Sequence, residues 1–140
     1  MSSSNFIRKL SGEKTPIWFL KLLGNIWFPY LGAGITVDEV TPDYLYIKVS
    51  MKMRWYNKNY VGTHFGGSLY AMTDPFYMLM LMNNLGRGYI VWDKAASIDF
   101  KKPGQGKVTA EFKMTSDEIA DIKAKADASG KYIFDKTVNI

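Results

Sequence analysis

The residue types that could act on a carbonyl group gather in residues 59–74, Asn-Tyr-Val-Gly-Thr-His-Phe-Gly-Gly-Ser-Leu-Tyr-Ala-Met-Thr-Asp. Gly66 and Gly67 stand where a loop leads into a long apolar segment, and a ligand can approach their backbone closely because they carry no Cβ. The first N–H groups of a helix have no partner inside it, so this end favours a developing negative charge such as a carbonyl oxygen under attack. Asp74 follows Gly67 by seven residues, and Asn59 precedes it by eight. The spacing therefore indicates a carboxylate and an amide in the neighbourhood of a glycine-lined helix end.

Asp74 and Gly67 cannot both reach one carbonyl carbon from the same helix. Seven residues turn a helix by about 700°, so Asp74 would share the face of Gly67 about 10 Å further along. Two helices running antiparallel in two copies of the chain could bring the glycine end of one next to Asp74 of the other. The spacing therefore predicts a site shared between subunits of a homo-oligomer.

Pro75 leaves two arrangements open for the apolar segment that runs from Gly67 to Leu85. Apolar side chains surround its whole circumference, which is typical of a buried helix. Pro75 would remove the hydrogen bond to the carbonyl of Ala71 and disfavours helical geometry at Asp74. Either one helix begins near Gly67 and kinks at Pro75, or a helix begins at Pro75 with Asp74 as its structural N-cap.

The stretch resembles the signature of hotdog-fold thioesterases of the phenylacetyl-CoA type. That pattern runs from an Asn, through His-Gly-Gly, to an Asp seven residues after the second Gly, and Asn59, Gly66, Gly67 and Asp74 match it. The resemblance implies that the two glycines hold the carbonyl oxygen and that Asn59 orients substrate or water. It also implies that Asp74 of the partner chain acts as general base on water or attacks the thioester directly.

The sequence departs from this pattern at one position and resembles a second pattern there. Phe65 stands where the pattern has His, and His64 lies one residue earlier. An uncharacterised hotdog-fold family is similar in carrying Gly-Thr-x-Phe-Gly-Gly and Trp-Asp-Lys, which match residues 62–67 and 92–94. Residues 96–104 also look like the strand and turn that follow the central helix in such enzymes. Together these similarities cover residues 30–140.

The resemblance implies an α+β hotdog fold, in which an antiparallel sheet wraps around a long central helix, assembled as a dimer or tetramer. The implied activity is hydrolysis of an acyl-CoA thioester, with coenzyme A as part of the substrate and no separate cofactor. The candidate substrate contacts are Thr63, His64, Phe65, Lys101 and Lys102. His64 could be a base or an ordinary loop histidine, and the two lysines could hold coenzyme A phosphates or be merely solvated.

Composition narrows the range of functions. The chain of 140 residues has the size of one domain, and 47% hydrophobic with 22% charged residues is ordinary for a globular protein. It has no cysteine and one histidine, which excludes disulfides and thiol catalysis and argues against a metal site. The net charge is +5, but the basic residues are mostly interleaved with acidic residues rather than gathered in a stripe. We therefore expect no nucleic-acid partner.

The amino-terminal part predicts a polar mobile segment at 1–14 and a single domain at 15–140. Thr15 and Pro16 suit an N-cap and first helical position, followed by one or two short helices packed against the sheet. Docking on a membrane surface stays open as an alternative, through Trp18, Phe19, Trp27 and Phe28. The apolar run is too short and interrupted to span a bilayer or to act as a signal peptide, so we expect a cytoplasmic protein without stable membrane insertion.

Alternating apolar and polar residues predict strands at 34–40, 44–54 and 108–114, and apolar composition predicts strands at 89–100 and 132–140. Residues 116–128 predict a surface helix capped by Ser116. A hotdog sheet of this type would need one more strand after the last predicted one. We therefore expect a chain truncated at its carboxyl end.

Two other functional classes stay open. The first is a non-catalytic module that binds acyl-CoA or a fatty acyl chain, because Phe65 replaces the histidine of the thioesterase pattern. The second is a hotdog dehydratase that would use His64 with an acid, although the usual His-to-Pro-Gly context is absent.

Overall fold

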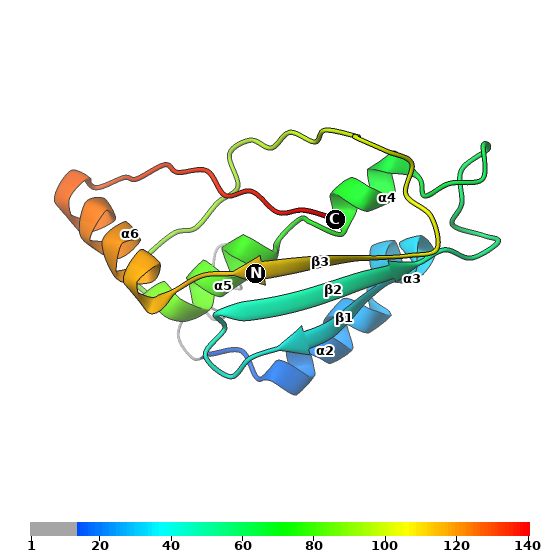
Figure 1. The fold of residues 1–140 in the computed structure, drawn as a ribbon. Helices are drawn as coiled ribbons and strands as arrows, with labels where there is room; N and C mark the ends of the chain where they lie inside the picture. Colours follow the sequence, from blue (N-terminus) through cyan, green and yellow to red (C-terminus); the bar gives the residue numbers. More distant parts are fainter. Residues whose placement is uncertain (1–13) are drawn as a thin grey trace, which may run out of the picture.

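The computed structural model of the protein describes residues 14–140, in which helices and a small antiparallel sheet form a mixed α+β fold (Figure 1). The predicted mobile segment therefore lies, except for Lys14, outside the described residues. The elements in chain order are α2 (Ile17–Ile26), α3 (Phe28–Ala33), β1 (Ile35–Val40), β2 (Tyr46–Lys52), α4 (Gly66–Ala71), α5 (Phe76–Leu85), β3 (Lys107–Lys113) and α6 (Ser116–Ser129).

The sheet has the order β1-β2-β3, with both neighbouring pairs antiparallel. Val37 of β1 faces Val49 of β2, which in turn faces Ala110 of β3, and all three are buried. Alternate residues point to opposite faces of a strand, so this row belongs to the core side of the sheet. The predicted strands at 34–40, 44–54 and 108–114 are confirmed, with their ends shifted by one or two residues.

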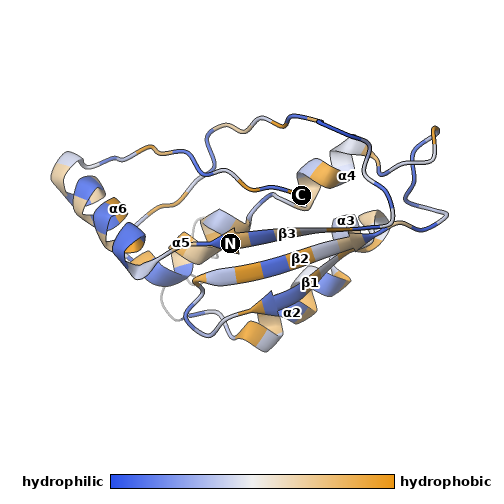
Figure 2. Ribbon diagram, viewed as in Figure 1, coloured by the Kyte–Doolittle hydropathy of each residue, from blue (hydrophilic) through white to orange (hydrophobic). Residues whose placement is uncertain are grey.

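The core lies between this face of the sheet and α5. Phe76 of α5 packs against Phe112 of β3 with ring centroids 4.9 Å apart, and the ring of Tyr30 of α3 lies 6.2 Å from that of Phe76. Met80 and Leu81 are buried along the same helix. Figure 2 shows hydrophobic residues along α5 and alternating along the strands. The burial of these side chains is the main favourable contribution to folding.

The apolar segment from Gly67 to Leu85 forms two helices rather than the single long one expected. Helix α4 ends at Ala71, and α5 begins at Phe76. Pro75 supplies the physical reason, because it has no N–H to continue the first helix and restricts the residue before it. Pro75 is itself the N-cap of α5, and no side chain of the described residues forms a capping hydrogen bond at this end of the helix. Asp74 therefore adopts neither of the two predicted arrangements.

The predicted strands at 89–100 and 132–140 are wrong for this structure, which leaves both segments outside the sheet. In Figure 1 they run as irregular chain above the sheet, without joining the β1-β2-β3 ladder. Side chains hold the C-terminal segment instead: Lys136 Nζ lies 2.9 Å from Glu118 Oε1, and Tyr77 Oη donates to the carbonyl of Thr137 at 3.3 Å. Apolar composition gives a segment strand propensity, but a strand forms only where a ladder partner is in reach.

Helix α6 starts one residue earlier than a cap at Ser116 predicts. Thr115, not Ser116, is the N-cap: its Oγ1 accepts from the Glu118 N–H at 3.1 Å, while the Glu118 carboxylate accepts from the Thr115 N–H at 2.9 Å. This reciprocal capping box satisfies two helix-end donors.

The two N-terminal helices, α2 and α3, both pack against β1, as expected for short helices packed on the sheet. Polar side chains make the attachment of α2. Asn25 Oδ1 accepts from the Val37 N–H at 2.8 Å, and Lys21 Nζ donates to the carbonyl of Asp38 at 2.8 Å. Pro16 rather than Thr15 is the N-cap of α2. No helix within residues 14–140 is long and apolar enough to cross a membrane.

Asn57 joins three elements through one buried amide. Its Nδ2 donates to the carbonyls of Ala33 and Lys52, each at 2.9 Å, and its Oδ1 accepts from the Arg54 N–H at 2.6 Å. Asn57→Ala would leave these backbone groups without their partner, and we expect unfolding to become easier by about 2–3 kcal/mol. Urea denaturation measures this change. Lys58→Ala, an exposed neighbour, should stay within about 0.5 kcal/mol of the original protein, and an equal loss in both variants would contradict the role of the amide.

Candidate active site

Asp74 lies at the break between α4 and α5, with its side chain exposed. Its backbone is held from two sides. The Asp74 N–H donates to the carbonyl of Tyr70 at 3.3 Å, and the Tyr30 hydroxyl donates to the Asp74 carbonyl at 3.2 Å. Burial and, secondarily, the charge of Asp74 raise the pKa of Tyr30 well above its usual value, so its hydroxyl stays a proton donor at neutral pH. The buried Tyr30 phenol thereby holds the backbone of Asp74 at the surface.

A second carboxyl group, Asp93, lies close enough to feel the charge of Asp74. Partial desolvation raises the pKa of Asp93, and the negative charge of Asp74 raises it further. A carboxyl group whose pKa is raised by desolvation and by a nearby negative charge is a candidate for acid–base work. The structure therefore places Asp93 where the charge of Asp74, nineteen residues earlier in the chain, acts on it.

Gly66 and Gly67 form the first turn of α4, at the end opposite to Asp74. Among the described residues neither glycine N–H has an acceptor. Both glycines are covered by aromatic rings. A Cβ on Gly66 would lie 3.0 Å from Cζ of Phe100, and one on Gly67 would lie 2.5 Å from Cε1 of Phe65. The absence of side chains is thus needed for this close packing, whether or not a ligand also binds there.

The side-chain amide of Asn59 forms its hydrogen bonds within its own loop. Its Nδ2 donates to Thr63 Oγ1 at 2.9 Å and to the His64 carbonyl at 3.3 Å. Its Oδ1 accepts from the N–H groups of Val61 and Thr63 at 3.1 and 3.0 Å. These bonds use both amide hydrogens and both oxygen lone pairs, so Asn59 could orient a substrate only if the loop rearranged.

His64 is buried, with 3% of its surface exposed. The ring Nε2 of His64 lies 3.0 Å from the Gly106 carbonyl, and its backbone N–H donates to the Gly104 carbonyl at 3.0 Å. Both bonds attach the loop to the chain before β3. Its buried Nδ1 has no partner among the described residues. This position suits a structural histidine better than a base that must meet substrate.

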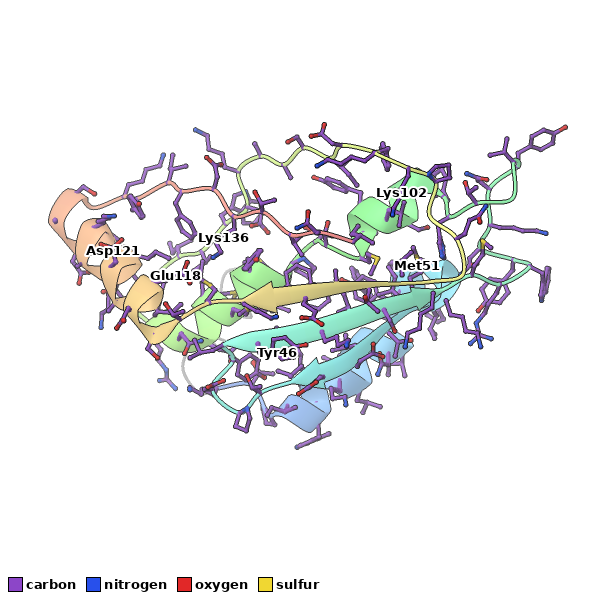
Figure 3. All side chains as sticks on the ribbon, in the orientation of Figure 1. Tyr46, Met51, Lys102, Glu118, Asp121 and Lys136 are labelled. Atoms are coloured by element: carbon purple, nitrogen blue, oxygen red, sulfur yellow. The ribbon has the colours of Figure 1, made fainter. Side chains whose placement is uncertain are left out.

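Lys101 and Lys102 are exposed and lie near the glycine end of α4, since they directly follow Phe100, whose ring contacts Gly66. Figure 3 shows Lys102 on the chain that passes α4. The structure therefore brings the two lysines and the glycines to one region, as a phosphate-bearing ligand at this end would need.

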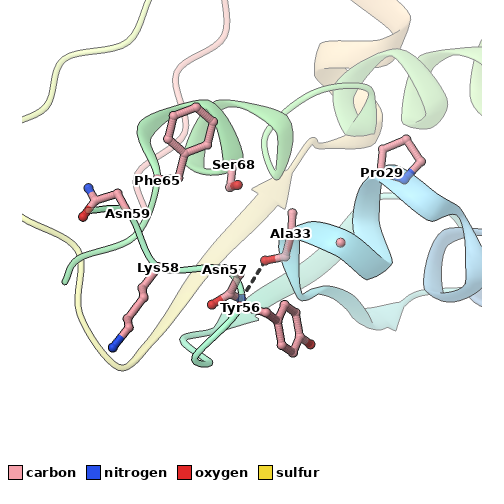
Figure 4. A pocket seen from close by; sticks show the side chains of 9 residues that line it. Pro29, Ala33, Tyr56, Asn57, Lys58, Asn59, Phe65 and Ser68 are labelled. Carbon is pink, nitrogen blue, oxygen red and sulfur yellow. Dashed lines mark hydrogen bonds between the residues drawn. The ribbon is translucent and has the colours of Figure 1, made fainter. Parts of the chain in front are cut away.

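An open hollow of about 360 Å³ adjoins this region (Figure 4). Its walls come from α3, the loop at 56–59 and the start of α4, and they include the predicted residues Asn59 and Phe65. Asp74 and the glycines are not part of its lining. Within residues 14–140, no group of three or more His, Asp or Glu side chains could hold a metal ion.

Tyr30, Asp93 and Phe100 are the residues of this region that sequence reasoning did not select. Asp93 stands in the Trp-Asp-Lys motif at 92–94, which could have marked it as a second carboxyl. Tyr30 and Phe100 carry no local signal, because their roles depend on contacts with Asp74 and Gly66 that only the fold creates.

Comparison with solved structures shows the class of fold. The chain is similar to a protein of unknown function from Pseudomonas aeruginosa, PA5026, whose 1.5 Å crystal structure is described as a probable thioesterase. The TM-score is 0.70 at 18% sequence identity, over 84% of this chain and 78% of that one. The shared α+β architecture is consistent with a hotdog-like fold.

The family follows from the sequence profile. Residues 17–137 match the domain of unknown function DUF4442, and the chain belongs to this family. No curated protein matches the chain.

The carboxyl pair can be tested by titration. Asp74→Asn removes the charge that raises the pKa of Asp93, so the pKa of Asp93 should fall toward its ordinary value while the desolvation remains. Carboxyl NMR shifts of Asp93 followed against pH measure this directly. Asp117→Asn in the first turn of α6 is the control and should leave the titration unchanged. An unchanged titration in Asp74→Asn would show that the two groups do not interact.

Proposed function

We propose that the protein hydrolyses acyl-CoA thioesters at a site shared between two copies of the chain. The observation that carries this proposal is the exposed Asp74 at the break between α4 and α5, whose backbone carbonyl accepts from Tyr30 and whose charge raises the pKa of Asp93. The fold shared with a probable thioesterase supports the same reaction class.

In the proposed reaction Asp74 takes a proton from water while the water oxygen attacks the thioester carbonyl carbon. The carbonyl oxygen becomes negatively charged in the tetrahedral intermediate. Collapse of this intermediate breaks the carbon–sulfur bond, leaving a carboxylic acid and a thiolate, and the thiolate takes up a proton. Asp93 is suited to give its own proton to the thiolate, because its raised pKa keeps it protonated to higher pH than an ordinary aspartate. Asp74 then passes the proton that it took from water to Asp93, which restores both groups.

The N–H groups of Gly66 and Gly67 from a second copy are proposed to receive the carbonyl oxygen. Two facts support a shared site over a site within one chain. The glycines and Asp74 lie at opposite ends of α4, and both glycine N–H groups are without acceptors among the described residues. Lys101 and Lys102, near the glycine end, are proposed to contact the phosphates of coenzyme A.

The test is thiol release from a panel of short, long and aromatic acyl-CoA substrates. Asp74→Asn should lower kcat at least about a hundredfold, the lower range of general-base effects. Asp117→Asn, an exposed aspartate on α6, should retain full activity. Circular dichroism of each variant checks that it is folded. Equal rates for Asp74→Asn and the original protein would remove Asp74 from catalysis.

A non-catalytic acyl-CoA binding module is the second candidate. It is favoured by the amide of Asn59, whose hydrogen bonds are all used within its loop, and by Phe65 in place of the pattern's histidine. Calorimetric binding of an acyl-CoA together with no thiol release from any substrate would support this candidate over the enzyme.

A further inference from the structure

The outer face of the sheet, which points away from the core, carries a hollow of about 510 Å³ near the end of β2 and the start of β3. The side chains that line it come from β1, from β2 and the chain just after it, and from the first residue of β3. The volume is that of a small-molecule site. None of the candidate catalytic or substrate-contacting residues lines this hollow, so it is a separate place in the fold.

Three basic side chains gather in this outer hollow, namely Lys52, Arg54 and Lys107. Lys52 of β2 and Lys107 of β3 are register partners, so two like charges stand directly opposite each other on one face of the sheet. Such a pair is destabilising unless an anion offsets it. Within residues 14–140, no carboxylate lies within ion-pair distance of any of the three. The cluster therefore suits a phosphate group, whose oxygens accept several charge-assisted hydrogen bonds.

Two short hydroxyl side chains come next along the strands. Thr36 of β1 and Ser50 of β2 are register partners, and both line the outer hollow. Ser50 stands two residues before Lys52 and therefore on the same face of β2. A hydroxyl group both donates and accepts hydrogen bonds, so this row suits a ligand that itself carries hydroxyl groups.

A carboxylate, Asp38, follows the hydroxyl row. Asp38 is the extra residue of a β-bulge, since Val37 pairs with Val49 while Glu39 pairs with Lys48. A bulge re-aims a side chain, and Asp38 is part of the lining of the outer hollow. Its Oδ2 is buried without a hydrogen-bond partner among the described residues, which costs free energy. Asp38 therefore suits a ligand that donates a hydrogen bond and disfavours one that is only an anion.

We propose that the outer hollow binds a small metabolite in which a phosphate group is esterified to a sugar. Lys52, Arg54 and Lys107 hold the phosphate, and Asp38 accepts a hydrogen bond from a sugar hydroxyl. The order of side chains along the strands, cations, then hydroxyls, then a carboxylate, matches the order of groups in such a molecule. Inorganic phosphate alone meets the repulsion of Asp38 without using its acceptor. This binding does not depend on the proposed thioester hydrolysis.

The experiment is isothermal titration calorimetry of the full chain at low salt with three probes: ribose 5-phosphate, ribose and inorganic phosphate. We expect ribose 5-phosphate to bind more tightly than inorganic phosphate, and ribose to give no measurable heat. Added salt should weaken the binding, because the cations are at the surface. Absence of ribose 5-phosphate binding overturns the proposal. Equally tight binding of inorganic phosphate also overturns it, since the hollow would then be a site for any anion.

The double variant Arg54→Gln and Lys107→Gln should lower the affinity for ribose 5-phosphate at least about tenfold. The matched control, Lys123→Gln with Lys131→Gln, removes the same two positive charges from exposed lysines outside the hollow and should bind like the original protein. Circular dichroism checks the fold of each variant. Equal losses in the two double variants would show a general effect of net charge and overturn the site.

Asp38→Asn tests the sugar contact by itself. The substitution removes the charge that repels phosphate and leaves a weaker acceptor for a hydroxyl. The preference for ribose 5-phosphate over inorganic phosphate, taken as the ratio of the two affinities, should therefore fall. An unchanged ratio would show that Asp38 does not contact the sugar and would overturn the assignment of the ligand class.

Discussion

Pro75 is the constraint on which the arrangement around Asp74 depends. Without an N–H to donate, it ends the helical ladder that begins at Gly66, and the chain re-enters a helix only at Phe76. The intervening turn exposes the Asp74 carboxylate and offers its backbone carbonyl to Tyr30. The same turn directs Phe76 into the core between Tyr30 and Phe112. One imino acid thus links the packing of the interior to the presentation of the candidate catalytic group.

The alternation of apolar and polar residues predicts those strands in which it also identifies the buried face. The period of two in β2 and β3 places Val49, Ala110 and Phe112 in the core, and the structure agrees. The pattern fails for residues 89–100 and 132–140, because strand formation there depends on a neighbouring edge rather than on the residues themselves. It also fails to predict the two separate helices on either side of Pro75, since the geometry of that turn depends on contacts with α3.

The candidate site shows the same division. The spacing from Gly67 to Asp74 predicts that the two lie on different levels of one helix, but α4 ends at Ala71 and Asp74 lies beyond it. The hydrogen bonds that engage Asn59 and His64 within the protein could not be predicted from the sequence. Each side chain could act on a ligand, but each is engaged with backbone groups of residues 61–64 or 104–106. Asp93 meets Asp74 only through the path of the chain after α5, which no short motif specifies.

The order of elements along the chain has a consequence for folding. The helices α2 and α3 and the strands β1 and β2 follow one another without interruption, so this unit forms through contacts between near neighbours. Strand β3 is separated from β2 by all the residues between Lys52 and Lys107, and its pairing closes a much longer loop. As the chain leaves the ribosome, the apolar face of β1 and β2 is therefore complete before Phe76 and Phe112 are available to cover it. We expect this unit to fold first and to need protection from aggregation until β3 covers its apolar face.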